Sequence, residues 1–290
     1  MTANITNDLI SASPNRRRFL KTIGVATAAA GAFALAGSTP VEAQTATELD
    51  ILNFALNLEY LEAEFYTYAV TGKSITSFGL GIDGRANGSN PAAGGTTVGG
   101  SQVNFSDDEI FSHEIAAEIG ADERAHVSLL RSALGNAAVA KPNLNLNALG
   151  FGFGNQTEFL RAARILEDIG VTAYSGAAGL LKTPGIITTA ARLLAAEAEH
   201  VGSVRTQVAR LKIPTSAVDG ADLIPPPSGK GRYLSINLSN GLPATRTAGQ
   251  VSFLAFGMKA GVKQGGFFPN GLNGAITSST EPATDSNLAT

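Results

Sequence analysis

Two Glu-x-x-His pairs stand out in this chain, Glu123 with His126 and Glu197 with His200. Each pair lies in a long stretch rich in Ala and Leu, and a helix of 3.6 residues per turn places both members of a pair on one face. Carboxylates and imidazoles together form a ligand set suited to iron or manganese. Because the chain has only 3 His in all, two such pairs indicate a metal site rather than chance.

Each pair is preceded by a glutamate in a separate stretch, and a tyrosine follows that glutamate seven residues later. These partners are Glu59 with Tyr66 and Glu167 with Tyr174. The repeated pattern predicts that four Glu and two His converge inside a four-helix bundle and hold two iron or manganese ions. We expect the two tyrosines either to donate hydrogen bonds to the ligating carboxylates or to fill the core.

Some neighbouring residues could take the same roles. Glu62 is an alternative to Glu59, which we prefer because a tyrosine follows it at the same spacing as in the second half of the chain. Among Glu59, Glu62 and Glu64, at least one is expected to face solvent. His113 precedes Glu123 by ten residues and lies outside the pattern, so we expect it to be a polar or half-buried helix residue rather than a ligand.

Four helical stretches would position these residues. Helix-start signals precede each stretch: the capping boxes Thr45 to Glu48 and Ser106 to Glu109, the run Asn155 to Glu158, and the pair Thr183-Pro184. Helix-stop signals follow at Gly72, Gly135 and before Pro214, whereas the third stretch continues to Lys182. The similar lengths of the four stretches, roughly 40 Å at 1.5 Å per residue, favour an all-α bundle over residues 44–212.

The connections between the stretches are unequal. Residues 72–105 form a Gly- and Asn-rich insertion, either a decorated surface segment or a partly disordered one, with Asp83 as its only ligand-type residue. Residues 135–155 suit the long crossover between two helical hairpins. From residue 213 to residue 290 the chain carries Pro225-Pro226-Pro227 and scattered Gly, and we expect a low-helix extension, with a hairpin packed on one end of the bundle.

Composition excludes several other functions. The chain has 290 residues, of which 44% are hydrophobic and 16% charged, so it can bury a substantial core. Its formal net charge is −3, and no basic stripe with interleaved aromatic residues points to nucleic acid. With 0 Cys, neither disulfides nor thiolate metal sites are possible.

The first 43 residues have the pattern of an export signal. Arg16-Arg17-Arg18-Phe19-Leu20-Lys21 fits the twin-arginine motif, and an Ala- and Gly-rich apolar run follows that is too short to span a bilayer comfortably. Val41-Glu42-Ala43 then supplies a cleavage site. The sequence therefore predicts a periplasmic or extracellular protein, exported in the folded state and without an integral membrane segment after processing.

Several runs of residues resemble a known family. Residues 53–66, 123–127 and 197–201, with the Gly- and Asn-rich run at 265–274, are similar to the ferritin-like domain of the desiccation-related proteins. The resemblance implies a ferritin-like four-helix bundle in which Glu123 and Glu197 bridge two metals. It also implies Glu59 and Glu167 as terminal chelators, with His126 and His200 supplying one imidazole to each metal.

Three functions are compatible with this pattern. The first is a redox-active dimetal protein that consumes peroxide or dioxygen, which would be an oxidoreductase of the peroxidase, catalase or ferroxidase type. The second is a metal-sequestering protein without turnover, and the third is a non-catalytic stress-protective or interaction protein. The insertion and the extension would obstruct the packing of a storage cage, so we expect at most a smaller homo-oligomer.

Overall fold

The computed structural model describes residues 46–86, 90–105, 110–228, 231–237 and 240–284. The predicted export signal and the predicted capping box at residues 106–109 lie outside these residues. Within them, none of the helices combines the length and the apolar character that crossing a bilayer requires.

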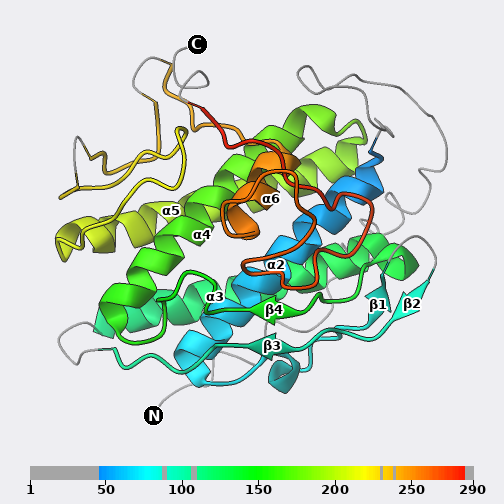
Figure 1. Cartoon of the computed structure of the whole chain (residues 1–290), viewed down its shortest axis with the longest axis horizontal. Coiled ribbons are helices and arrows are strands. Elements are labelled where there is room, and N and C mark those ends of the chain that lie inside the picture. The colour runs from blue at the N-terminus through cyan, green and yellow to red at the C-terminus, as the bar shows by residue number, and fades with distance from the viewer. Residues whose placement is uncertain (1–45, 87–89, 106–109, 229–230, 238–239, 285–290) are drawn as a thin grey trace.

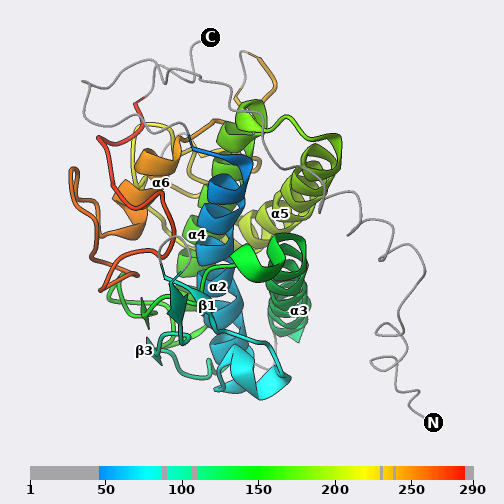
Figure 2. The same ribbon diagram turned by 90° about the vertical axis from the view of Figure 1, so that its right-hand side faces the viewer.

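Four long helices form two packed pairs. α2 (Glu48–Thr71) packs mainly on α3 (Ile110–Leu134), and α4 (Gln156–Ala177) packs mainly on α5 (Pro184–Arg210). Figure 1 shows the four helices as one bundle, and Figure 2 shows α3 and α5 together on one side of it. The expected all-α helical bundle is confirmed.

The start of α2 differs from the expected one. Thr47 is the N-cap, and its side chain and that of Asp50 make the two reciprocal bonds of a capping box. The capping box predicted at residues 45–48 is therefore wrong by two positions. Glu48 instead accepts hydrogen bonds from the backbone of Lys182 and from both the backbone and the hydroxyl of Thr183. This contact ties the start of α2 to the start of α5.

The end of α4 also differs from the expected one. Asn155 is its N-cap and accepts from the backbone of Glu158 at 3.0 Å, as predicted. The α-helix stops at Ala177, however, and continues only as a 3₁₀ turn, η4 (Ala178–Leu180). The chain needs the remaining residues for the reversal into α5, whose first residue is Pro184. Proline disfavours a helical conformation in the residue before it, so α4 cannot run directly into α5.

The insertion packs on the bundle through short strand pairs. After η1 (Ile75–Phe78), β1 (Gly84–Arg85) pairs antiparallel with β2 (Pro91–Ala92). β3 (Thr97–Val98) then pairs parallel with β4 (Leu144–Asn145), which belongs to the crossover; the crossover begins with η3 (Gly135–Ala137).

Glu64 of α2 anchors this region. It accepts from the Ser74 hydroxyl, the Ile75 backbone and the Thr97 hydroxyl, and it faces the ammonium of Lys141 at 3.4 Å.

The part of the extension that carries α6 lies along the side of the bundle (Figure 1, Figure 2). Among its described residues is the helix α6 (Ala248–Ala255), which packs on α4 (Figure 1). Figure 2 shows α6 on the side of the bundle away from α3 and α5. Of the expected hairpin, the described residues show an isolated antiparallel bridge between Ile236 and Pro243. The apolar residues of the extension belong to the main core, among them Val251, Phe256 and Phe268. The Thr247–Gln250 capping box explains why this short apolar run is helical.

Buried arginines also fasten the extension. Arg205 of α5 donates to Asp168 of α4 at 2.6 Å, and Arg164 donates to Asp222 of the extension at 2.7 Å. Arg205 further donates to the backbone carbonyls of Leu223, Arg232 and Tyr233. Because each guanidinium is nearly inaccessible to solvent and paired, the extension is part of the folded unit rather than a loose appendage.

Candidate metal centre

The six predicted ligands meet in the middle of the bundle. Each of the four long helices supplies at least one of them, and all six side chains are buried. They are Glu59 of α2, Glu123 and His126 of α3, Glu167 of α4, and Glu197 and His200 of α5. Residues separated by up to 141 positions therefore form one cluster because the bundle brings their inward faces together.

Two overlapping groups make up the cluster. In the first, one ligand atom from each of Glu59, Glu123, His126 and Glu197 lies within 4.8 Å of the others. The second meets the same criterion with Glu123, Glu167, Glu197 and His200. Glu123 and Glu197 belong to both groups, so these two carboxylates are placed as bridging ligands of two metal ions would be.

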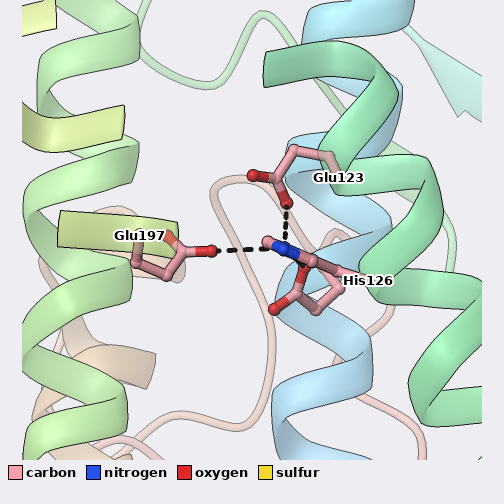
Figure 3. Close-up of side chains that lie close together, drawn as sticks. Glu123, His126 and Glu197 are labelled. Carbon is pink, nitrogen blue, oxygen red and sulfur yellow. Dashed lines mark ion pairs between the residues drawn. The ribbon is translucent and has the colours of Figure 1, made fainter. Parts of the chain in front are cut away.

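Each imidazole directs Nδ1 at the carboxylates. His126 Nδ1 lies 3.2 Å from Glu59 Oε2, 3.4 Å from Glu123 Oε2 and 3.6 Å from Glu197 Oε1. Figure 3 shows His126 between Glu123 of its own helix and Glu197 reaching across from α5. His200 Nδ1 lies 3.0 Å from Glu123 Oε1 and 3.4 Å from Glu167 Oε2. The two histidines thus take equivalent positions in the two groups.

The ligand atoms lack other partners. Buried atoms without a hydrogen bond include both carboxylate oxygens of Glu123, Glu167 and Glu197, Oε2 of Glu59, and Nδ1 of both His126 and His200. Leaving a buried polar group unpaired costs roughly 1–3 kcal/mol, and more for a charged group. So many unpaired acceptors at one place fit two cations that would accept these lone pairs and balance the carboxylate charge.

Without metal, protons must supply the missing positive charge. Burial and the adjacent charge of Glu59 raise the pKa of Glu123 to about 7. Burial, followed by the charge of Glu123, raises the pKa of Glu197 well above its usual value. In a protonated carboxyl, a hydrogen occupies one of the oxygen lone pairs that would otherwise bind a metal ion. The metal-free cluster is therefore a proton-holding form of the same site.

The histidines and Glu59 shift in the complementary direction. Burial alone would lower the pKa of His126, but the charge of Glu59 and the contacts with Glu123 and Glu197 outweigh it, so that pKa is raised. The pKa of His200 is raised in the same way, mainly by Asp122 and Glu123 acting against burial. Burial opposes ionisation of Glu59 too, yet the His126 charge and hydrogen bonds hold its pKa below the usual value.

The two tyrosines are paired crosswise. Tyr174 of α4 donates a hydrogen bond to Glu59 of α2, the glutamate of the other half. Tyr66 of α2 is fully buried near Glu167 of α4. Burial, followed by the charge of Glu167, raises the pKa of the Tyr66 hydroxyl well above its usual value. That hydroxyl makes no hydrogen bond. Glu59 precedes Tyr66 in α2, whereas its partner Tyr174 follows Glu167 in α4. The two helices therefore run antiparallel.

Glu62 lies beside the cluster rather than within it. It is 5% exposed and belongs to neither group of ligand atoms, whereas Glu59 belongs to the first. Burial, and then the charges of Glu197 and Glu123, raise its pKa well above the usual value. The expectation that at least one of Glu59, Glu62 and Glu64 faces solvent is wrong, because all three are buried. α2 is enclosed by α3, by α4 and by the insertion, which leaves it no fully solvated face.

Two further residues complete the surroundings. His113 is exposed and places its ring against Phe105, 5.2 Å between centroids, away from both groups. Asp122, which no sequence pattern indicated, contacts His200 Nε2 at 3.3 Å through Oδ2, and its side chain is 51% exposed. Asp122 precedes Glu123 directly, but its partner is on another helix, so no spacing in the sequence could have identified it.

The fold and the buried carboxylate–histidine cluster define a ferritin-like protein. Residues 47–210 match the family described as the ferritin-like domain, and the chain belongs to that family. The chain is also 28% identical over 177 residues to the desiccation-related protein PCC13-62 of Craterostigma plantagineum. That alignment covers 55% of this chain and 52% of the relative, so the similarity spans about half the length of each. The predicted resemblance is confirmed.

Proposed function

We propose that this chain binds two iron or manganese ions at the Glu and His cluster and uses them to consume dioxygen or peroxide. The observation that carries the proposal is the set of nine buried carboxylate and imidazole atoms without hydrogen-bond partners in the middle of the bundle. An ordinary core would not retain so many unpaired polar atoms. Two divalent ions balance the charge of the four carboxylates.

The residues divide between two ion positions. Glu59 and His126 would hold one ion, Glu167 and His200 the other, with Glu123 and Glu197 shared. When bound, a pair of iron or manganese ions supplies Lewis acidity and one-electron redox steps. The protein excludes bulk water from the site, because the six ligand residues are buried. Tyr174 fixes the orientation of Glu59 through its hydrogen bond.

Metal analysis and turnover assays test the proposal together. We expect about two ions per chain after anaerobic reconstitution with Fe(II) or Mn(II), followed by consumption of dioxygen or peroxide. Fewer than one ion per chain would refute the metal site. Full loading with no consumption of either oxidant would instead identify metal sequestration without turnover.

The biological setting is also a proposal. The relative is described as desiccation-related, and a protein that removes oxidants would protect a drying cell, so we propose a stress-protective role. Arg16 to Lys21 support export by the twin-arginine route to the periplasm or beyond. Replacing Arg16 and Arg17 with Lys should retain the protein in the cytoplasm, as measured by cell fractionation. Unchanged fractionation would contradict this route.

A further inference from the structure

A small cavity lies between the bundle and the extension. Its volume is about 30 Å³, and its walls come from α2, from α4, from the crossover and from the extension that carries α6. Figure 1 shows α6 lying over α2 and α4. Representative lining residues are Leu58 of α2, Ile169 of α4, and Leu254, Met258 and Phe267 of the extension. All of the lining side chains are apolar except that of Glu62.

The cavity lies between an exposed residue of the extension and a buried residue beside the cluster. Met258 is 49% exposed, whereas Glu62, which lines the same cavity, is 5% exposed. Met side chains are flexible and adapt to a guest. The cavity thus has an outer part at Met258 and an inner part at Glu62.

Gly170 brings the inner part directly to the metal-binding carboxylates. It lines the cavity, and a Cβ at this position would lie 2.4 Å from Glu197 Oε2 and 3.5 Å from Glu62 Oε1. Any larger residue would displace the Glu197 carboxylate. Because Gly170 has no side chain, the Glu197 carboxylate and the cavity both lie directly against the backbone of α4 at this residue.

The chemistry of the walls selects the occupant. One water needs roughly 10–15 Å³ of such volume and two to four polar partners, so the cavity is large enough for a diatomic molecule. Its single polar group cannot satisfy the several donors and acceptors of hydrogen peroxide, and burying such a molecule without partners is costly. Dioxygen has no such requirement.

From this geometry we infer that the cavity is a binding site and access path for dioxygen, which reaches the metal cluster between Glu62 and Gly170. The inference rests on the proposed dimetal function and makes dioxygen rather than peroxide the oxidant that uses this path. It also gives the extension a role, because Leu254, Ala255 and Phe267 close a wall that the four helices alone leave open.

Xenon binding tests the cavity without any metal. Xenon occupies dry apolar cavities, so crystals of the metal-free protein under xenon pressure should show a xenon atom between Leu254 and Ile169. Ala255→Leu should fill the cavity and abolish that peak. Ala244→Leu is the matched control, because Ala244 is buried in the extension in a separate small cluster with Ala221 and Ala283. Absence of xenon in the wild-type cavity would overturn the inference.

Oxidant consumption tests the path. In protein loaded anaerobically with Fe(II), Ala255→Leu should slow dioxygen consumption at least tenfold while changing peroxide consumption less than twofold. Ala244→Leu should alter neither. Equal dioxygen rates in the two variants would overturn the inference. Failure of the wild type to load iron or to consume either oxidant would instead refute the proposed function, while the xenon result would still decide whether the cavity binds an apolar guest.

A variant that enlarges the cavity covers the case in which Ala255→Leu does not fold. Leu254→Ala removes a wall residue, so xenon occupancy should increase and dioxygen consumption should stay equal or become faster. A slower rate for Leu254→Ala with intact metal loading would overturn the inference.

Discussion

Glu123 and Glu197 differ from the other proposed ligands because each belongs to both groups of the cluster. Replacing Glu123 with Gln should therefore impair both ions, whereas replacing Glu167, which belongs to one group, should leave about one ion per chain. Metal analysis after reconstitution measures the difference. The metal-free Glu123→Gln variant should melt no lower than the wild type, since it loses a buried acid whose pKa is raised to about 7. Equal metal loss in the two variants would contradict the bridging role.

In the proposed metal site, Tyr174 would act through Glu59. Tyr174→Phe removes one hydrogen bond to that carboxylate, and loss of such a partner typically weakens metal affinity by about 10- to 100-fold. Calorimetric titration with Mn(II) should show weakening at one of the two ions only.

Tyr60→Phe is the matched control for this variant. Tyr60 is a buried tyrosine of α2 whose hydroxyl donates to the Val139 carbonyl at 3.3 Å, outside the cluster. Its replacement should leave both affinities unchanged. A similar loss in both variants would indicate a general packing effect instead of a role for the Tyr174 hydrogen bond.

At the scale of elements, one close backbone contact helps to hold the extension against α4. A Cβ at Gly176 would lie 2.1 Å from the backbone oxygen of Arg246. That oxygen cannot move alone, because the Arg246 side chain is held by Asp219 and by Thr172. Gly176→Ala should thus displace the segment before α6 and destabilise the protein by about 1–3 kcal/mol, as overpacking does.

Gly202 provides the control for that substitution. It lies in α5 with nothing within 4 Å of an added Cβ. Gly202→Ala should be neutral or stabilise the protein by roughly 0.5–1 kcal/mol, because Ala favours the helix. Urea denaturation measures both variants. Equal stability of the two would show that the extension is seated loosely on α4.

At the scale of the whole molecule, metal binding should stabilise the fold and depend on pH. The raised pKa values of His126 and His200 mean that the metal-free protein holds protons on both imidazoles at neutral pH. A metal ion requires the neutral form, so binding releases protons. Affinity should then rise with pH, by about tenfold per pH unit for each proton released.

Calorimetry in buffers of different ionisation enthalpy counts those protons. At a free metal concentration of about 100 times Kd, one site should add roughly 2.7 kcal/mol to the free energy of unfolding. At one fixed free metal concentration, affinity falls as pH falls, so the increase in Tm on adding metal should be smaller at pH 6 than at pH 8. Zero proton release, or a gain in Tm that does not vary with pH, would contradict this description of the site.

Much of the candidate site could be predicted from local spacing. Glu123 with His126, and Glu197 with His200, share helix faces because of the 3.6-residue turn, which acts over only a few residues. Helix ends marked by Gly72, Asn155 and Pro184 were predicted for the same reason. The start of α2 was predicted two positions too early, because Thr45 and Thr47 are both residues that can cap a helix.

The sequence by itself determined which side chains could bind metal, the helical stretches that carry them and the ferritin-like family. Only the tertiary structure decided which helices are neighbours and in which direction they run. That arrangement pairs Tyr174 with Glu59 of the other half, buries Glu62 and Glu64, and places α6 over a cavity that reaches Glu62. The physical reason is that helix spacing is a local property of the backbone. Burial, charge pairing and cavities arise from contacts between segments far apart in the chain.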